Sequence, residues 1–183
     1  KMDVIVISLI SYLMGSIPFG FLLTKIFLKK DIREIGSGNT GATNALRTGN
    51  KIIGISTLIF DILKAVAPLI FIKLNFPEFI FVSSLLIFLG HVFPVWLKFK
   101  GGKGVATYLG ILLCINYILG LIFIITWLIF FFISKYSSLS SLISSLIIPI
   151  YYFFFIKDNN YYFFIIMLIL IFYTHRQNIK RLI

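Results

Sequence analysis

The sequence predicts an all-α polytopic membrane protein with seven transmembrane helices, its N-terminus outside and its C-terminus in the cytoplasm. Of its 183 residues, 60% are hydrophobic and only 13% are charged, and the mean hydropathy is +1.04. A water-soluble domain of this length cannot bury so much apolar surface, and a disordered chain has the opposite composition. Long apolar runs therefore indicate helices that cross a bilayer.

Six apolar stretches mark the predicted spans, at 4–24, 52–73, 79–97, 105–134, 139–156 and 161–174. The first has the length of a signal peptide, but apolar residues continue to Leu28 without a clear Ala-x-Ala cleavage site, so we interpret it as a span. As a single helix, 105–134 would measure about 45 Å against a hydrocarbon core of ~30 Å. We expect it to divide at Asn116-Tyr117, which gives seven spans.

The basic residues also favour seven spans over six. With seven spans, the cytoplasmic side holds thirteen of the 17 basic residues: Lys25, Lys29, Lys30, Arg33, Arg47, Lys51, Lys98, Lys100, Lys103, Lys135, Arg176, Lys180 and Arg181. Lys1, Lys73 and Lys157 lie outside, and Lys64 lies within a span. This is the positive-inside pattern, so the net charge of +11 indicates topology rather than nucleic-acid binding. We see no linker and expect one transmembrane domain over 1–183.

The first of three polar segments is Gly36–Arg47, which contains the pattern G-x-G-x-x-G. A dinucleotide site would need an acid about 20 residues on, and Asp61 stands there inside a predicted span, so we exclude that interpretation. Glycines still let a backbone approach phosphate oxygens. We assign phosphate binding to Ser37, Gly38, Asn39, Gly41, Thr43, Asn44 and the bidentate donor Arg47. A polar loop of ordinary turn residues is the alternative.

The second segment runs from Gly90 to Thr107 and includes Gly101-Gly102-Lys103-Gly104. It lacks the Walker A spacing, because Leu97 stands where the first glycine would be, and nucleotide hydrolysis is not supported. The glycines and Lys103 still make a flexible anion site in front of a helix that begins near Gly104. The alternative is a positive-inside anchor made of Lys98, Lys100 and Lys103.

The third segment, His175–Leu182, follows the last predicted span. On helical spacing, His175 and Asn178 share a face that would line a site, while Arg176 and Lys180 point toward lipid head groups. A cation at a helix C-terminus is the alternative for His175.

A few polar groups lie at or within the predicted spans themselves. We expect Asp61 and Lys64 to form an ion pair that faces the bundle interior, and His91, beside Pro94, to be structural. The serines that head the sixth span would cap its helix or supply hydroxyls to the cytoplasmic site: Ser137, Ser138, Ser140 and Ser141.

The sequence lacks the marks of several other chemistries. It has no G-x-S-x-G elbow, which argues against a covalent serine mechanism, and it has no His-x4-Asp pairing. Its single cysteine, Cys114, permits no internal disulfide, and its six carboxylates do not cluster. We therefore expect neither a metal ion nor another cofactor.

Together the three segments resemble the membrane-integral bacterial glycerol-3-phosphate acyltransferases that use acyl phosphate as donor. The resemblance covers nearly the whole chain, including Gly15–Pro18, Asp31–Arg33, Asp61 with Lys64, and Tyr136–Ser141. Thr40 stands where Pro is expected, Lys135 where Arg is common, and the chain ends at Ile183 before an expected Gly-x-Glu. The family implies seven spans in the bacterial inner membrane and an active site at the cytoplasmic face.

The resemblance also implies the reaction: acyl transfer to the 1-hydroxyl of sn-glycerol 3-phosphate, giving lysophosphatidate and inorganic phosphate in the first acylation step of phospholipid synthesis. We assign catalytic roles to His175, Lys103, Ser37 and Asn178. We assign substrate or phosphate binding to Gly38, Asn39, Gly41, Thr43, Asn44, Arg47, Gly101, Gly102, Gly104, Ser138 and Ser141. Either His175 or the departing phosphate takes the hydroxyl proton.

The expected partners are acyl phosphate, glycerol 3-phosphate, the bilayer and the enzyme that supplies acyl phosphate, with no nucleic acid. The rival interpretation is a small organophosphate transporter. Carriers place polar, broken-helix features near the midplane in repeated halves. This sequence shows no repeat and places its polar segments on one predicted face, which favours the enzyme.

Overall fold

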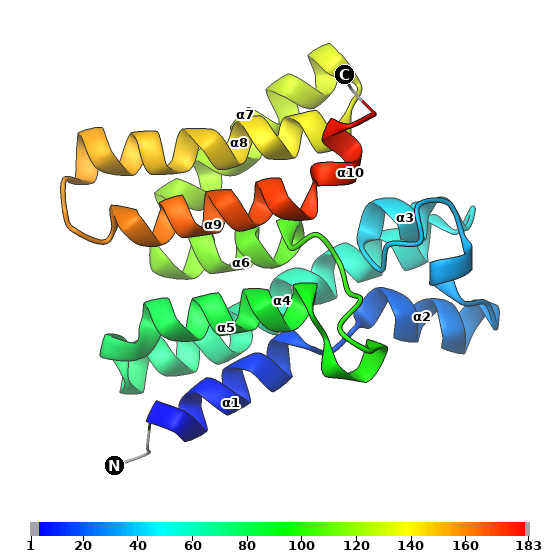
Figure 1. The fold of residues 1–183 in the computed structure, drawn as a ribbon, viewed down its shortest axis with the longest axis horizontal. Coiled ribbons are helices and arrows are strands. Elements are labelled where there is room, and N and C mark those ends of the chain that lie inside the picture. Colours follow the sequence, from blue (N-terminus) through cyan, green and yellow to red (C-terminus); the bar gives the residue numbers. More distant parts are fainter. Residues whose placement is uncertain (1–3, 182–183) are drawn as a thin grey trace. The chain divides into compact units, whose positions relative to one another are not determined.

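The structure, a computed structural model, describes residues 4–181 and is helical, with connecting loops, throughout that range (Figure 1). This confirms the all-α class. The chain forms two compact units, Lys1–Ile115 (unit 1) and Asn116–Ile183 (unit 2), and each is described by itself. The single domain over 1–183 stays a prediction.

In the described residues, unit 1 contains three long apolar segments, the shorter helix α6 and several short helices. Its helices are α1 (Val4–Gly15), α2 (Phe19–Leu28), η1 (Ile32–Glu34), α3 (Ala42–Leu46), α4 (Lys51–Asn75), η2 (Pro77–Phe79), α5 (Ile80–Val92), η3 (Val95–Leu97) and α6 (Val105–Ile115). Figure 1 shows α1, α2 and α5 running in one direction and α4 and α6 in the other. The carboxyl ends of α2 and α5 therefore lie toward the same end of the unit as the amino ends of α4 and α6.

The first predicted span is broken between α1 and α2 at Ser16-Ile17-Pro18. Proline carries no backbone N–H and disfavours a helical conformation in the residue before it, so the helix stops and restarts here. Next to the break, α1 crosses α5 closely through Gly15 and Gly90, because a Cβ on either glycine would overlap the backbone of the other helix. Small residues allow such close crossings of membrane helices.

Unit 2 consists of α7 (Tyr117–Ser134), α8 (Ser137–Tyr151), the π-helical turn η4 (Tyr152–Ile156), α9 (Tyr161–Thr174) and the short α10 (Arg176–Ile179). Four serine hydroxyls of α8 donate to the backbone carbonyl four residues earlier: Ser140, Ser141, Ser144 and Ser145. The helix satisfies its own hydroxyls in this way and can pack against α7 and α9.

Within residues 4–181, an apolar helical segment lies at each of the seven predicted positions. Five of them, in the described residues, are long and apolar enough to cross a membrane: Val4–Leu28, Lys51–Asn75, Pro77–Leu97, Tyr117–Ser134 and Ser137–Ile156. The other two, Val105–Ile115 and Tyr161–Thr174, are shorter. The predicted division at Asn116 is confirmed, because α6 ends at Ile115 and the Asn116 side chain caps α7 by accepting a hydrogen bond from the Ile118 N–H at 2.9 Å.

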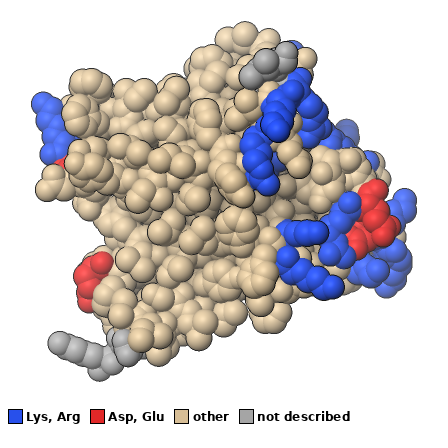
Figure 2. Space-filling model, viewed as in Figure 1, with Lys and Arg blue, Asp and Glu red and all other residues tan. Residues whose placement is uncertain are grey.

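Basic side chains gather at one end of each unit (Figure 2). In unit 1 they belong to α2, to the amino end of α4 and to the loops beside them, while Lys73 and Glu78 lie near the junction of α4 and α5 at the opposite end. We call the end of unit 1 that carries α2 and the amino end of α4 the basic end of unit 1. Its basic residues are Lys25, Lys29, Lys30, Arg33, Arg47, Lys51, Lys98, Lys100 and Lys103. In unit 2 the corresponding group is Lys135, Arg176, Lys180 and Arg181, and Lys157 lies in the turn at the other end. Lys1 lies outside the described residues.

Candidate functional site

The loop that contains Gly36–Arg47 is introduced by a tight acidic cap. The Asp31 carboxylate accepts a hydrogen bond from the Arg33 N–H at 2.9 Å and pairs with the Arg33 guanidinium at 2.6 Å. This hydrogen bonding stabilises the ionised carboxylate and lowers the pKa of Asp31 to about 2. Gly36 and Gly38 follow with φ of +55° and +69°, a region that glycine enters without strain, and the chain turns back toward α3.

Asn44 holds this loop together from the inside. Its side chain lies in α3 and is buried, with 2% exposed. The amide nitrogen lies 2.8 Å from the Ile35 and Asn39 carbonyl oxygens, and the amide oxygen accepts from the Ser37 N–H at 3.0 Å. We expected Asn44 to donate to phosphate. The structure instead commits its donors to the loop backbone, so Asn44 shapes the surface that the other groups present.

Four of the residues in this loop that we assigned to phosphate binding are exposed: Ser37, Gly38, Thr43 and Arg47. Asn39 is half-buried, and its side-chain oxygen accepts from the Gly41 N–H at 2.9 Å. Arg47 borders the loop, with Nη1 3.5 Å from the Asn44 Oδ1. The loop therefore offers a guanidinium, hydroxyls and backbone at the basic end of unit 1.

The Gly101–Gly104 loop packs tightly against the carboxyl end of α5. The N–H groups of Gly101 and Gly102 donate to the Val92 and His91 carbonyl oxygens at 3.0 and 3.1 Å. A Cβ on Gly101 would overlap the His91 carbonyl oxygen, and one on Gly104 the Phe88 ring. We expected the Gly101 and Gly102 N–H groups to bind phosphate, but in the structure they donate to the backbone of α5. Lys103, half-buried, is the cationic group that this loop carries.

Unit 1 also contains the predicted ion pair between Asp61 and Lys64. Both side chains are buried in α4, and Lys64 Nζ lies 2.8 Å from Asp61 Oδ1, which confirms the pair. His91, which we expected to be structural, joins this pair: Nδ1 of its buried side chain lies 3.7 Å from the same carboxylate oxygen. His91 on α5 and Asp61 on α4 are 30 residues apart, a separation for which no sequence pattern gives a signal.

His175 lies between α9 and α10 in unit 2, with 2% of it exposed. Its Nδ1 lies 2.8 Å from the carbonyl oxygen of Ile171, one turn earlier in α9. A carbonyl oxygen only accepts, so we assign the proton of the neutral ring to Nδ1 and the lone pair to Nε2. A main-chain carbonyl thus orients the imidazole.

The predicted faces around His175 agree with the burial of their side chains. Asn178 is half-buried, whereas Arg176 and Lys180 are exposed. Arg176 stacks over Tyr173, with 4.3 Å from Cζ to the ring centroid, and donates to the Tyr173 carbonyl at 2.9 Å. We predicted this face from the spacing of one continuous helix. The structure has two helices here, because α9 ends at Thr174 and α10 begins at Arg176.

The two predicted serine sites differ from each other. Ser141 is buried; its hydroxyl donates to the Ser137 carbonyl at 2.8 Å and accepts from the Trp127 indole N–H at 3.1 Å. It therefore joins α8 to α7 instead of presenting a hydroxyl to phosphate. Ser138 is half-buried in the first turn of α8 and keeps its assignment as a prediction.

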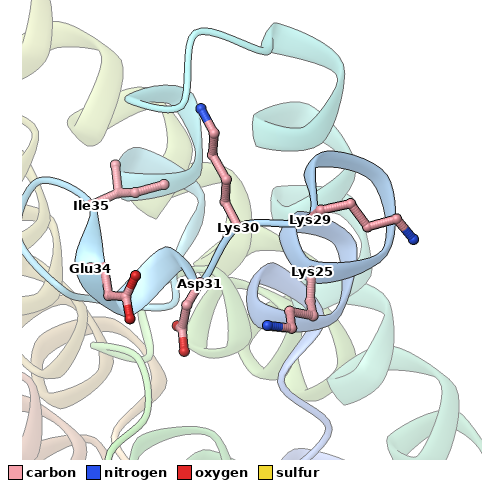
Figure 3. Close-up of a pocket in the computed structure, with 6 residues that line it drawn as sticks. All are labelled: Lys25, Lys29, Lys30, Asp31, Glu34 and Ile35. Atoms are coloured by element: carbon pink, nitrogen blue, oxygen red, sulfur yellow. The ribbon is translucent and has the colours of Figure 1, made fainter.

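A polar hollow lies beside the Gly36–Arg47 loop (Figure 3), lined by Lys25, Lys29, Lys30, Asp31, Glu34 and Ile35. In Figure 3, Lys29 and Lys30 point away from each other, and carboxylates share the rim. We assign it no ligand. Among residues 4–181, no three His, Cys, Asp or Glu side chains group in a way that could hold a metal ion.

The chain is similar to known proteins over nearly its full length. The family model "Glycerol-3-phosphate acyltransferase" matches residues 5–183. A curated relative of that name from Pelagibacter ubique is 66% identical over 99% of this chain and 94% of the relative. Another, from Mesorhizobium japonicum, is 47% identical over 94% of this chain and 88% of the relative.

Two crystal structures of PlsY (YgiH), an integral membrane glycerol 3-phosphate acyltransferase, have the same fold. The glycerol 3-phosphate form matches with a TM-score of 0.90 and 36% identity over 98% of this chain and 91% of the other. The lysophosphatidic acid form matches with a TM-score of 0.88 and 35% identity over 98% of this chain and 91% of the other. The family match spans all three polar segments.

Proposed function

This chain belongs to the glycerol-3-phosphate acyltransferase family, and from that membership we propose that acyl phosphate is its donor and the 1-hydroxyl of glycerol 3-phosphate its acceptor. In the reaction the hydroxyl oxygen attacks the acyl carbonyl carbon, an ester bond forms, and the bond from that carbon to the phosphate oxygen breaks. The products are lysophosphatidate and inorganic phosphate. The family match favours this enzyme over the organophosphate transporter.

The observation that carries the proposal is the placement of two different cations on two polar loops at the basic end of unit 1. Arg47 offers a planar guanidinium beside exposed hydroxyls, and Lys103 offers an ammonium on a loop fixed to α5. Both substrates are phosphate monoanions or dianions, and charge-assisted hydrogen bonds are the strong ones for such groups. We assign Arg47 and Lys103 to the two phosphates.

The PlsY structures support the choice of acceptor and product. One of them is a glycerol 3-phosphate form and the other a lysophosphatidic acid form. These are the acceptor before transfer and the acylated product after it. With 36% identity and a TM-score of 0.90, the same ligand classes are the natural assignment for this chain.

An acyl phosphate is a mixed anhydride with a good leaving group, so the protein need not supply a nucleophile. Its task is to hold two phosphate-bearing molecules in attack geometry and to stabilise the developing charge. We assign the hydroxyl proton to the departing phosphate, which keeps the step balanced. His175 Nε2, which carries the lone pair, then accepts a hydrogen bond from the phosphate hydroxyl, or takes the proton itself instead. Ser37 and Asn178 complete the proposed catalytic group.

The donor assignment predicts a substrate preference. Acyl phosphate leaves its chain in the bilayer and brings only a small head group to the loops, whereas acyl-CoA would need a nucleotide pocket. We expect purified protein to release phosphate and form lysophosphatidate from acyl phosphate and glycerol 3-phosphate, with excess chelator present. Acyl-CoA and acyl carrier protein thioesters are the comparison donors. Efficient transfer from a thioester, or a requirement for a divalent ion, would contradict this assignment.

The seven-span topology is also a proposal, because α6 and α9, with 11 and 14 residues, are shorter than the five long segments. Charge supports it: the basic ends of the two units together hold thirteen of the 17 basic residues. We expect a reporter fused to the N-terminus to be active outside and one fused to the C-terminus to be active in the cytoplasm. If both reporters lay on one side of the inner membrane, an even number of spans would replace seven.

A further inference from the structure

A buried cluster of three titratable side chains in unit 1 has no part in the proposed chemistry. Asp61 and Lys64 on α4 are 2% and 4% exposed, and their Oδ1 and Nζ lie 2.8 Å apart. His91 on α5 is 6% exposed and places Nδ1 3.7 Å from the same oxygen. Charged groups at such depth are costly, and in membrane proteins they usually serve a function.

On one side, this Asp61–Lys64–His91 cluster fixes the break in the first span. Lys64 Nζ donates to the Ile17 carbonyl oxygen at 2.9 Å. Ile17 lies between α1 and α2, where the helical hydrogen-bond ladder is interrupted before Pro18. The Ile17 carbonyl oxygen also accepts from the Phe19 N–H at 3.2 Å, so the ammonium is its second donor and ties the break to α4.

On the other side, the cluster contacts the loop that carries Lys103. The Gly102 N–H donates to the His91 carbonyl at 3.1 Å, and a Cβ on Gly102 would overlap the His91 ring. One turn beyond Lys103, the Thr107 hydroxyl donates to the Asp61 carbonyl oxygen at 3.2 Å. The residue just before Lys103 and the first turn of α6 after it are therefore both tied to members of the cluster.

We propose that the Asp61–Lys64–His91 cluster positions Lys103 for its phosphate contact, with His91 as the positioning residue that touches the loop. The inference rests on the proposed function, in which Lys103 binds a substrate phosphate. The cluster joins the α1–α2 break, α4, α5 and the start of α6 at one point. Rigid placement of this kind matters because a displacement of about 1 Å can lower a rate about 100-fold.

A double-mutant cycle tests the coupling between His91 and Lys103. We expect His91→Gln to lower kcat/KM for acyl phosphate and glycerol 3-phosphate by about 10- to 100-fold. In a Lys103→Ala background, the same substitution should cost less than about twofold more, because the group that it positions is absent. The melting temperature in detergent is measured for each variant, since a merely structural role would lower kcat/KM by the same factor in both backgrounds.

A second substitution keeps the test available if His91→Gln does not fold. Thr107→Val preserves the shape of the side chain and removes its bond to the Asp61 carbonyl. We expect kcat/KM to fall by about 3- to 10-fold, again only when Lys103 is present. Thr57→Val is the matched control: Thr57 is a buried α4 residue whose hydroxyl donates to its own helix at Ile53, and kcat/KM should not change.

Three outcomes would overturn the inference. The first is an equal effect of His91→Gln with and without Lys103, and the second is wild-type kinetics in both His91→Gln and Thr107→Val. The third is normal kinetics in Lys103→Ala, which would remove the phosphate contact that the cluster is proposed to position. In that third case, lysophosphatidate formation by the unsubstituted protein would still support the proposed function, so the two failures can be told apart.

Discussion

Replacing His175 with alanine is expected to lower kcat for acyl transfer by about 100-fold or more. The buried imidazole is oriented by a 2.8 Å contact between its Nδ1 and the Ile171 carbonyl, which leaves Nε2 as the acceptor nitrogen. Loss of a positioned acid–base group typically costs about 10²-fold or more. The measurement is single-turnover and steady-state phosphate release at saturating substrates.

The neighbouring Arg176 supplies the matched control for this experiment. Its guanidinium is exposed and stacks on Tyr173, so Arg176→Ala removes a cation next to His175 while leaving the buried face unchanged. We expect its kcat to stay within about twofold of wild type. If Arg176→Ala were the damaging variant and His175→Ala the mild one, the inward face of this segment would be assigned wrongly.

Arg47→Ala and Lys103→Ala should each lower kcat/KM by about 10- to 150-fold. A lost charge-assisted hydrogen bond is worth about 1.5–3 kcal/mol, and every 1.36 kcal/mol is tenfold in rate. Neither substitution should lower the melting temperature markedly, because Arg47 is exposed and Lys103 is half-buried on a loop whose glycines make the packing contacts. The two KM values identify which phosphate each cation contacts.

Two lysines at the same basic end of unit 1 provide controls for charge alone. Lys51 at the start of α4 and Lys100 beside the glycine loop are both exposed. Lys51→Ala and Lys100→Ala reduce the net charge as the test variants do, and we expect near-normal kinetics from them. If Arg47→Ala and Lys103→Ala were equally mild, these cations would be positive-inside anchors rather than phosphate ligands.

Apolar periodicity and charge were sufficient to predict the segments of this fold. The all-helical class, the division at Asn116 and the Asp61–Lys64 pair all follow from local composition and from i, i+3 spacing, and the structure confirms them. The seven spans stay a prediction, because five segments have the length and apolarity to cross a membrane. The exposure of Arg176 and the burial of His175 follow from the same spacing. Such features depend on a few neighbouring residues, which is why a single sequence reveals them.

Other roles could not be read from the sequence, because they depend on partners far along the chain. The glycines of Gly101–Gly104 suggested a phosphate loop, but the backbone carbonyls of α5 use two of their N–H groups. Ser141 suggested a phosphate hydroxyl, but the Trp127 indole uses it. The residue type determines which hydrogen bonds a side chain can make. The packing determines which of these hydrogen bonds form.

The sequence by itself determined the all-helical class, the order of the apolar helical segments and which residue types could carry phosphate chemistry, because hydropathy and charge act locally along the chain. Only the tertiary structure decided that Asn44 holds the first loop together from inside and that His91 joins Asp61 and Lys64 behind the second. These contacts connect residues on different elements. A buried polar group must find its partner wherever the packed backbone brings one, and that location is set by the fold.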